Sequence, residues 1–160
     1  ADLFIRFGGH KQAAGMQIET GRLVELRDRL SVFANNRLGS KDLRPRLVID
    51  APLPLTSING SVLSDVNVME PFGFGNRRPV FHAEPVEVID GPHILKKKHI
   101  RMTVRQGRAR FRAIAWRSAD RSTLYSKHRS GLHLAFSLTE NNYRGETFLE
   151  LSVADAVEAR

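Results

Sequence analysis

The sequence predicts an α+β protein in which helices mix with short strands up to about residue 80 and strands dominate after it. Between residues 23 and 33, apolar side chains recur every three or four positions, which is the spacing of an amphipathic helix. After Pro79 the pattern changes to five runs in which apolar and polar residues alternate, which is typical of strands. The chain therefore divides near residue 80 into two parts of different character.

The bulk composition is that of a globular protein. Its 160 residues suffice for one sizeable domain or two small ones. No apolar run approaches the roughly 18–20 residues that a membrane-spanning helix needs, and the start lacks a signal-peptide pattern. We therefore expect a cytoplasmic protein with no membrane partner. The absence of cysteine excludes disulfides and thiol nucleophiles. Because the chain starts without Met and reaches a glycine-rich motif within ten residues, we also expect a fragment of a longer protein.

The first elements are short. Residues 4–7 form an apolar segment that Gly8 and Gly9 interrupt, residues 10–14 can form one helical turn, and residues 16–19 alternate like a strand. The helix that follows has Thr20 as its expected N-cap and ends between residues 35 and 40. A strand is expected at 46–51 and a weaker helix at 62–69, which Pro71 and the GFGN turn at 73–76 would stop.

Five strands are expected in the second half, at residues 86–89, 99–105, 110–116, 132–138 and 148–153. The polar segment 118–130 between the third and fourth strands can hold one helical turn or a short helix. This order matches an OB-fold, a five-stranded Greek-key barrel that often binds single-stranded nucleic acid or oligosaccharide. Other five-stranded barrels or an open sheet fit the same order.

Positive charge is concentrated in the strand-rich part. Between Gly91 and Gly131 lie twelve Lys and Arg residues and one acid, Asp120, although the whole chain has a net charge of only +8. Such a local field attracts polyanions, with nucleic acid ahead of an anionic membrane because no amphipathic helix accompanies it. A solvated face that only aids solubility is the alternative. The candidate nucleic-acid-binding residues are Lys96, Lys97, Lys98, Arg101, Arg105, Arg108, Arg110 and Arg112.

Aromatic side chains that stack on bases are fewer. Trp116 alternates with Ile114, which suggests that it faces the core, and Phe111 could face either way. Tyr125 and Tyr143 fall in expected loops, where they could stack on bases or cover an edge of the core. Electrostatics should therefore dominate, with weak sequence preference and steep salt dependence.

The glycine pair near the N-terminus suggests an anion site. If Gly8 and Gly9 lead into a helical turn, their N–H groups lie at the positive end of its dipole, where a phosphate can approach closely. His10 and Lys11 would add a hydrogen bond and a charge. A tight turn with a surface histidine is the alternative, because neither the dinucleotide-binding nor the P-loop pattern is present. The candidate phosphate-binding residues are Gly8, Gly9, His10 and Lys11.

Two runs resemble one known family. FGGHKQAAGM, at residues 7–16, resembles the Gly-Gly-His motif of the DHHA1 domain in the DHH phosphoesterase superfamily. MEPFGFGNRRPVF, at residues 69–81, resembles the junction before the OB-fold of RecJ single-strand-specific exonucleases. The order and spacing of the two runs are similar in that family. The resemblance implies that residues 1–50 form the C-terminal part of a DHHA1-type domain, 51–80 a connecting segment and 81–160 an OB-type nucleic-acid-binding domain.

The resemblance also implies a function. A RecJ-like enzyme digests single-stranded DNA from the 5′ end in DNA repair and recombination, with Mn or Mg held in a DHH domain. In this family the Gly-Gly-His loop faces the metal-bearing DHH domain across a cleft and touches substrate phosphate. Gly8, Gly9 and His10 would have that role here. The chain has no Asp-His-His triplet, and His82, His93, His99, His128 and His133 are scattered among expected strands and turns. We therefore expect no catalytic residue, no metal ligand and no cofactor in this fragment, which should not hydrolyse DNA alone.

Single-stranded DNA is the expected partner, and the acidic tail of a single-strand-binding protein is a second one. Two other interpretations stay open. The chain could belong to another DHH-family phosphoesterase, an oligonucleotide nuclease or phosphatase, although this leaves the five strands after Pro79 without a role. It could instead be an OB-type protein-interaction module whose basic patch meets an acidic protein. For the GFGN turn and the neighbouring Arg77 and Arg78, we favour a structural role at the domain junction over substrate contact.

Overall fold

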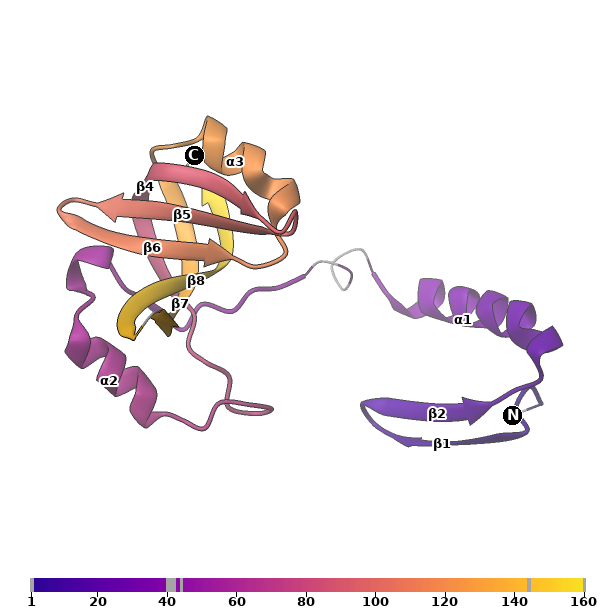
Figure 1. Cartoon of the computed structure of the whole chain (residues 1–160). Coiled ribbons are helices and arrows are strands. Elements are labelled where there is room, and N and C mark those ends of the chain that lie inside the picture. Colours follow the sequence, from indigo (N-terminus) through magenta and orange to yellow (C-terminus); the bar gives the residue numbers. More distant parts are fainter. Residues whose placement is uncertain (1, 40–42, 44, 144, 160) are drawn as a thin grey trace. The chain divides into compact units, whose positions relative to one another are not determined.

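The computed structural model describes residues 2–39, 43, 45–143 and 145–159. The chain forms two compact units, Ala1–Leu47 and Val48–Arg160, which are described one at a time (Figure 1). No helix in the described part of the chain is both long enough and apolar enough to span a membrane.

The N-terminal unit begins with a hairpin. Strand β1 (Arg6–His10) pairs antiparallel with β2 (Ala13–Gln17), and Gly9 lies opposite Ala14. A Cβ atom at Gly9 would lie 2.5 Å from the Cα atom of Ala14, so glycine permits the two strands to approach closely. The helical turn expected at 10–14 is wrong, because His10 pairs with Ala13 across the hairpin and residues 11 and 12 form the turn between the strands.

A single long helix completes the N-terminal unit. After a 3₁₀ turn η1 (Thr20–Arg22), α1 runs over Leu23–Arg37, which confirms that the residues with this spacing form a helix. The N-cap expected at Thr20 is wrong, because Thr20 is part of the 3₁₀ turn and no side chain caps either helix start. Leu23, Leu26 and Leu30 line an open apolar groove along α1.

The C-terminal unit starts with an irregular segment that leads to the barrel. The strand expected at 46–51 is reduced to β3 (Ala51–Pro52), which pairs in parallel with the start of β4. Prolines at 52 and 54 lack the N–H that a longer ladder needs. A 3₁₀ turn η2 (Leu55–Ser57) follows, and then α2 (Gly60–Val68) confirms the second expected helix. The side chain of Asn59 caps α2 by accepting from the N–H groups of Ser61 and Val62.

Five strands close into a barrel. The neighbour order is β4-β5-β6-β8-β7, and β7 pairs back onto β4, with β6 and β8 parallel and the other neighbours antiparallel. This closed five-stranded mixed barrel is an OB-fold of the expected α+β class (Figure 1). The strands are β4 (Phe81–Leu95), β5 (His99–Gln106), β6 (Ala109–Ala115), β7 (Leu132–Tyr143) and β8 (Glu146–Glu158). All five expected strands are found, each longer or shifted by a residue or more.

The barrel interior is apolar and alternates along each strand. Ile100, Met102 and Val104 of β5 are fully buried, as are Ala113 and Ala115 of β6. The helix α3 (Ser122–Lys127) lies between β6 and β7 in sequence, which confirms the short helix expected there. Its Tyr125 is 1% exposed in the core cluster, so the loop position expected for this residue is wrong.

The direction of Trp116 also differs from expectation. Because Ala113 and Ala115 face inward, Ile114 faces the other side of β6 and Trp116 beyond it is 56% exposed. Phe111 shares the inward direction and packs against the core. Residues along β6 do alternate between the two faces of the strand, as expected. The face expected for Trp116 is wrong, because the small residues Ala113 and Ala115, and not the larger Ile114 and Trp116, face the barrel interior. The side chain of Tyr143 lies outside the described residues.

Candidate nucleic-acid interface

A groove of about 830 Å³ crosses the outward faces of β5 and β6. Arg101 and Thr103 of β5 line it together with Arg112 and Ile114 of β6, and the β7–β8 hairpin forms one wall. In the ladder, Arg101 lies opposite Ile114 and Thr103 opposite Arg112. This is the face that OB-folds use for oligonucleotides and oligosaccharides, because the second and third strands and the adjoining loops form a shallow trough there.

Arginine and phenylalanine meet inside the groove. The guanidinium of Arg112 lies over the ring of Phe148 from β8, 4.6 Å from its centroid. The ring is half-buried on the groove lining, and it offers its π face to the cation. The N–H donors at the edge of the guanidinium remain available to phosphate or base oxygens.

The groove also has acidic and amide groups. Glu150 pairs with Arg112 in the parallel β6–β8 register, is 7% exposed, and accepts a 3.2 Å hydrogen bond from the Asn141 side-chain amide. Asp90 and Glu146 lie on the groove lining as well. A groove with both signs of charge can bind phosphates at its arginines and hydrogen-bond base edges at its amide and carboxylate groups.

The structure divides the eight predicted cations into three groups. Arg101 and Arg112 line the groove. Arg105 instead forms an ion pair with Glu87 of β4, in which its Nε donates to the carboxylate over 3.1 Å. The remaining five are exposed: Lys96, Lys97 and Lys98 in the β4–β5 turn, Arg108 in the β5–β6 turn, and Arg110 at the start of β6.

An aromatic pair stands at the end of the same hairpin. The Trp116 ring meets His99 edge to face, with 4.9 Å between ring centroids. His99 begins β5 directly after the three lysines, so an exposed indole and a cluster of cations are neighbours. Sequence reasoning missed Trp116 as a surface residue. The signal that could have found it is the alternation of β6: Ala113 and Ala115 face inward, so Trp116, the residue after Ala115, faces the other side.

The predicted phosphate-binding residues lie in the N-terminal unit. Gly8, Gly9 and His10 are exposed along β1, and Lys11 is exposed in the turn to β2. No helix begins at this point of the described chain, so the expected contribution of a helix dipole is wrong. What remains is an exposed hairpin edge with a histidine and a lysine at its tip.

Comparison with known proteins decides the family. A family model described as the RecJ OB domain matches residues 49–155. The chain belongs to this family.

The relatives of this RecJ OB domain are long proteins. The chain is 32% identical over 105 residues to the single-stranded-DNA-specific exonuclease RecJ of Bacillus subtilis, covering 65% of the chain and 13% of that protein. It is 25% identical over 156 residues to the enzyme of the same name from Thermus thermophilus, covering 96% and 21%. A crystal structure of Thermus thermophilus RecJ in complex with Mn²⁺ matches with a TM-score of 0.71 at 23% identity, over 99% of this chain and 22% of that one. This chain thus spans about a fifth or less of the relatives' length.

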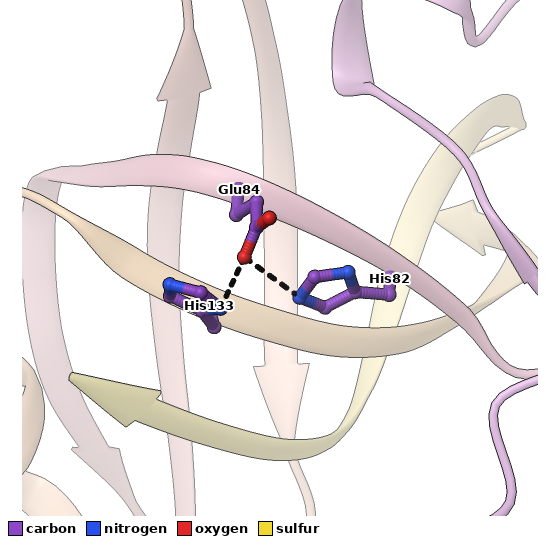
Figure 2. Close-up of side chains that lie close together, drawn as sticks. All are labelled: His82, Glu84 and His133. Atoms are coloured by element: carbon purple, nitrogen blue, oxygen red, sulfur yellow. Dashed lines mark ion pairs between the residues drawn. The ribbon is translucent and has the colours of Figure 1, made fainter. Parts of the chain in front are cut away.

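The fold of the RecJ OB domain gathers histidines that are far apart in sequence. His82 of β4 and His133 of β7 both contact the carboxylate of Glu84, which lies between their rings (Figure 2). The Nε2 atom of His82 is 3.5 Å from Oε2 of Glu84, and the same oxygen pairs with Nδ1 of His133. The expectation of scattered histidines is therefore wrong for these two. The pairing of β4 with β7, which no local pattern reveals, brings them together.

Proposed function

We propose that the barrel binds single-stranded DNA as part of a RecJ-like 5′-to-3′ exonuclease of DNA repair and recombination. The observation that carries the proposal is the groove on the β5–β6 face, where Arg101 and Arg112 point into the trough that OB-folds use for oligonucleotides. The names of the matched relatives, single-stranded-DNA-specific exonucleases, favour the same substrate.

In this proposal the strand follows the β5–β6 hairpin. Phosphates contact Arg101, Arg112 and the lysines of the β4–β5 turn, bases contact the ring of Trp116, and the ring of Phe148 positions Arg112. Hydrolysis takes place in a DHH domain with Mn or Mg, to which this chain contributes no metal ligand. The DHHA1-type assignment of residues 1–50, with Gly8, Gly9, His10 and Lys11 close to a substrate phosphate, is part of the same proposal.

Salt-dependent binding of an oligonucleotide tests the groove. With a labelled oligo-dT and fluorescence anisotropy, Arg112→Met should weaken binding and reduce the slope of log K against log salt by about 0.7, the value for one phosphate contact on a single strand. Lys127→Met is the matched control, because it removes one exposed positive charge from α3, outside the groove lining. Equal effects of the two substitutions would show that only the net charge of the chain matters, and would contradict DNA binding in the groove.

The alternative of a protein-interaction module rests on the same cations. An acidic peptide that mimics the tail of a single-strand-binding protein should compete with oligo-dT if both use the groove. If the surface served only an acidic protein, the peptide would bind at physiological salt and the oligonucleotide would not. The acidic residues Asp90, Glu146 and Glu150 on the groove lining repel phosphates and peptide carboxylates alike. They favour DNA over an acidic peptide only because they can accept hydrogen bonds from the amino groups of bases.

A further inference from the structure

We propose that His82, Glu84 and His133 form a zinc-binding site on the outer surface of the barrel (Figure 2). One donor atom from each residue, two imidazole nitrogens and one carboxylate oxygen, lies within 4.8 Å of both others. The two rings are 5.5 Å apart between centroids and tilted by 38°, with the carboxylate directed at both. None of the three residues lines the groove described above.

After small side-chain movements, the spacing of the three donor atoms suits a tetrahedrally coordinated ion. Zinc bonds of about 2.0–2.1 Å at tetrahedral angles place neighbouring donor atoms about 3.3 Å apart. The His82–Glu84 separation of 3.5 Å is already close to this value. The carboxylate has to withdraw slightly from His133, and the two imidazole nitrogens, which are within 4.8 Å of each other, have to adjust to the same spacing. The side chains of His82, His133 and Glu84 are 28%, 34% and 48% exposed, so there is space for these movements and for a water as fourth ligand.

The donor set selects the class of metal. Two imidazoles with one carboxylate are typical ligands of zinc and its first-row neighbours, whereas Mg²⁺ and Ca²⁺ prefer oxygen ligands throughout. Without metal, the same three groups form ion pairs when the imidazoles are protonated. Protons and zinc therefore compete for the same nitrogen atoms, and zinc affinity should fall on acidification.

The position of the cluster gives the ion a structural role. β4 and β7 are the strands that close the barrel, and their register shifts between Ala83 and Val86, beside Glu84. A zinc ion would link His82 and Glu84 on β4 to His133 on β7 across this irregular part of the seam. An ion that binds the folded barrel and not the unfolded chain raises the midpoint of thermal unfolding.

Titration with zinc alone tests the proposal. The 160-residue chain, freed of metal with a chelator, should bind one Zn²⁺ per chain in calorimetry near neutral pH, and excess Mg²⁺ should not displace it. His82→Ala, Glu84→Gln and His133→Ala should each lower the affinity by about tenfold or more, since even groups that only support a ligand contribute 10–100-fold. His93→Ala is the matched control, because His93 pairs with Asp90 at 3.1 Å without a second histidine; it should leave the affinity unchanged.

A second measurement identifies the donor atoms in the unaltered chain and so does not depend on how the variants fold. In ¹⁵N NMR spectra of the imidazole rings, zinc should shift Nε2 of His82 and Nδ1 of His133 while the His93 ring stays in place. The thermal midpoint should rise with zinc and lose this rise in Glu84→Gln. Failure to bind zinc, or binding that shifts other histidines or weakens equally in His93→Ala, would overturn the proposal.

Discussion

Arg112 on β6 and Phe148 on β8 form a cation–π contact inside the groove, with 4.6 Å between the guanidinium carbon and the ring centroid. The two strands run parallel and are direct neighbours. The contact holds the arginine over the groove floor instead of leaving it to move freely in solvent. A positioned guanidinium binds a phosphate at lower entropic cost than a freely rotating one.

Removal of the ring should therefore weaken DNA binding even though no charge is lost. Phe148→Leu keeps an apolar side chain on the groove lining but removes the π face. Because an exposed cation–π contact contributes about 0.5–1 kcal/mol, we expect oligo-dT affinity to fall about two- to fivefold at constant salt, with the salt slope unchanged. Anisotropy titrations measure both quantities. An unchanged affinity would argue against any role for the ring.

Trp116 should report directly on bound DNA. It is the single tryptophan of the chain and is 56% exposed beside His99. A base stacked on the indole should quench its fluorescence during an oligo-dT titration, and Trp116→Ala should lower affinity by about 1–3 kcal/mol, the range for one base on an aromatic ring. Titration with inorganic phosphate is the control, because it has no base to stack. Constant fluorescence at saturating oligonucleotide would place the strand elsewhere.

Gly91 should tolerate substitution less well than Gly75. Both have positive φ, 87° and 86°. A Cβ atom at Gly91 would lie 2.9 Å from the carbonyl oxygen of Arg101, whereas nothing lies within 4 Å at Gly75. Both alanine substitutions should cost about 1–3 kcal/mol for the backbone conformation, and Gly91→Ala should cost more because β5 must move. Chemical denaturation of the two variants compares them. A larger loss at Gly75 would contradict this packing.

Alkaline pH should destabilise the barrel through Tyr125. Burial raises the pKa of Tyr125 above its ordinary value of 10.0, with Asp155 adding to the rise and Arg121 opposing it. The protonated phenol is thus favoured in the folded state. The stability that it contributes to the fold is complete below pH 10 and is lost as the pH rises through the pKa of Tyr125 in the folded protein. We expect the thermal midpoint of Tyr125→Phe to fall less than that of the unaltered chain above pH 10. Parallel declines would contradict this assignment.

Much of the architecture follows from local patterns. Alternation identified all five barrel strands, and the spacing of leucines identified α1, because these periodicities express which side of an element faces the core. The excess of cations between residues 91 and 131 is also a property of the sequence alone. The OB-fold was one of several arrangements compatible with the strand order until the β4–β7 pairing closed the barrel.

Local patterns do not predict which side chains meet, because this depends on which strands become neighbours. Glu87 lies opposite Arg105 only because β4 pairs with β5 in that register. Their ion pair leaves one predicted cation fewer to bind DNA phosphates. The glycines at 8 and 9 form a hairpin because Gly15 and Ala14 lie across from them, and Trp116 faces outward because alanines fill the interior of β6. His82 and His133, fifty-one residues apart, meet at Glu84 for the same reason. Side-chain periodicity specifies the elements, whereas register between distant strands specifies which charges, rings and ligands meet.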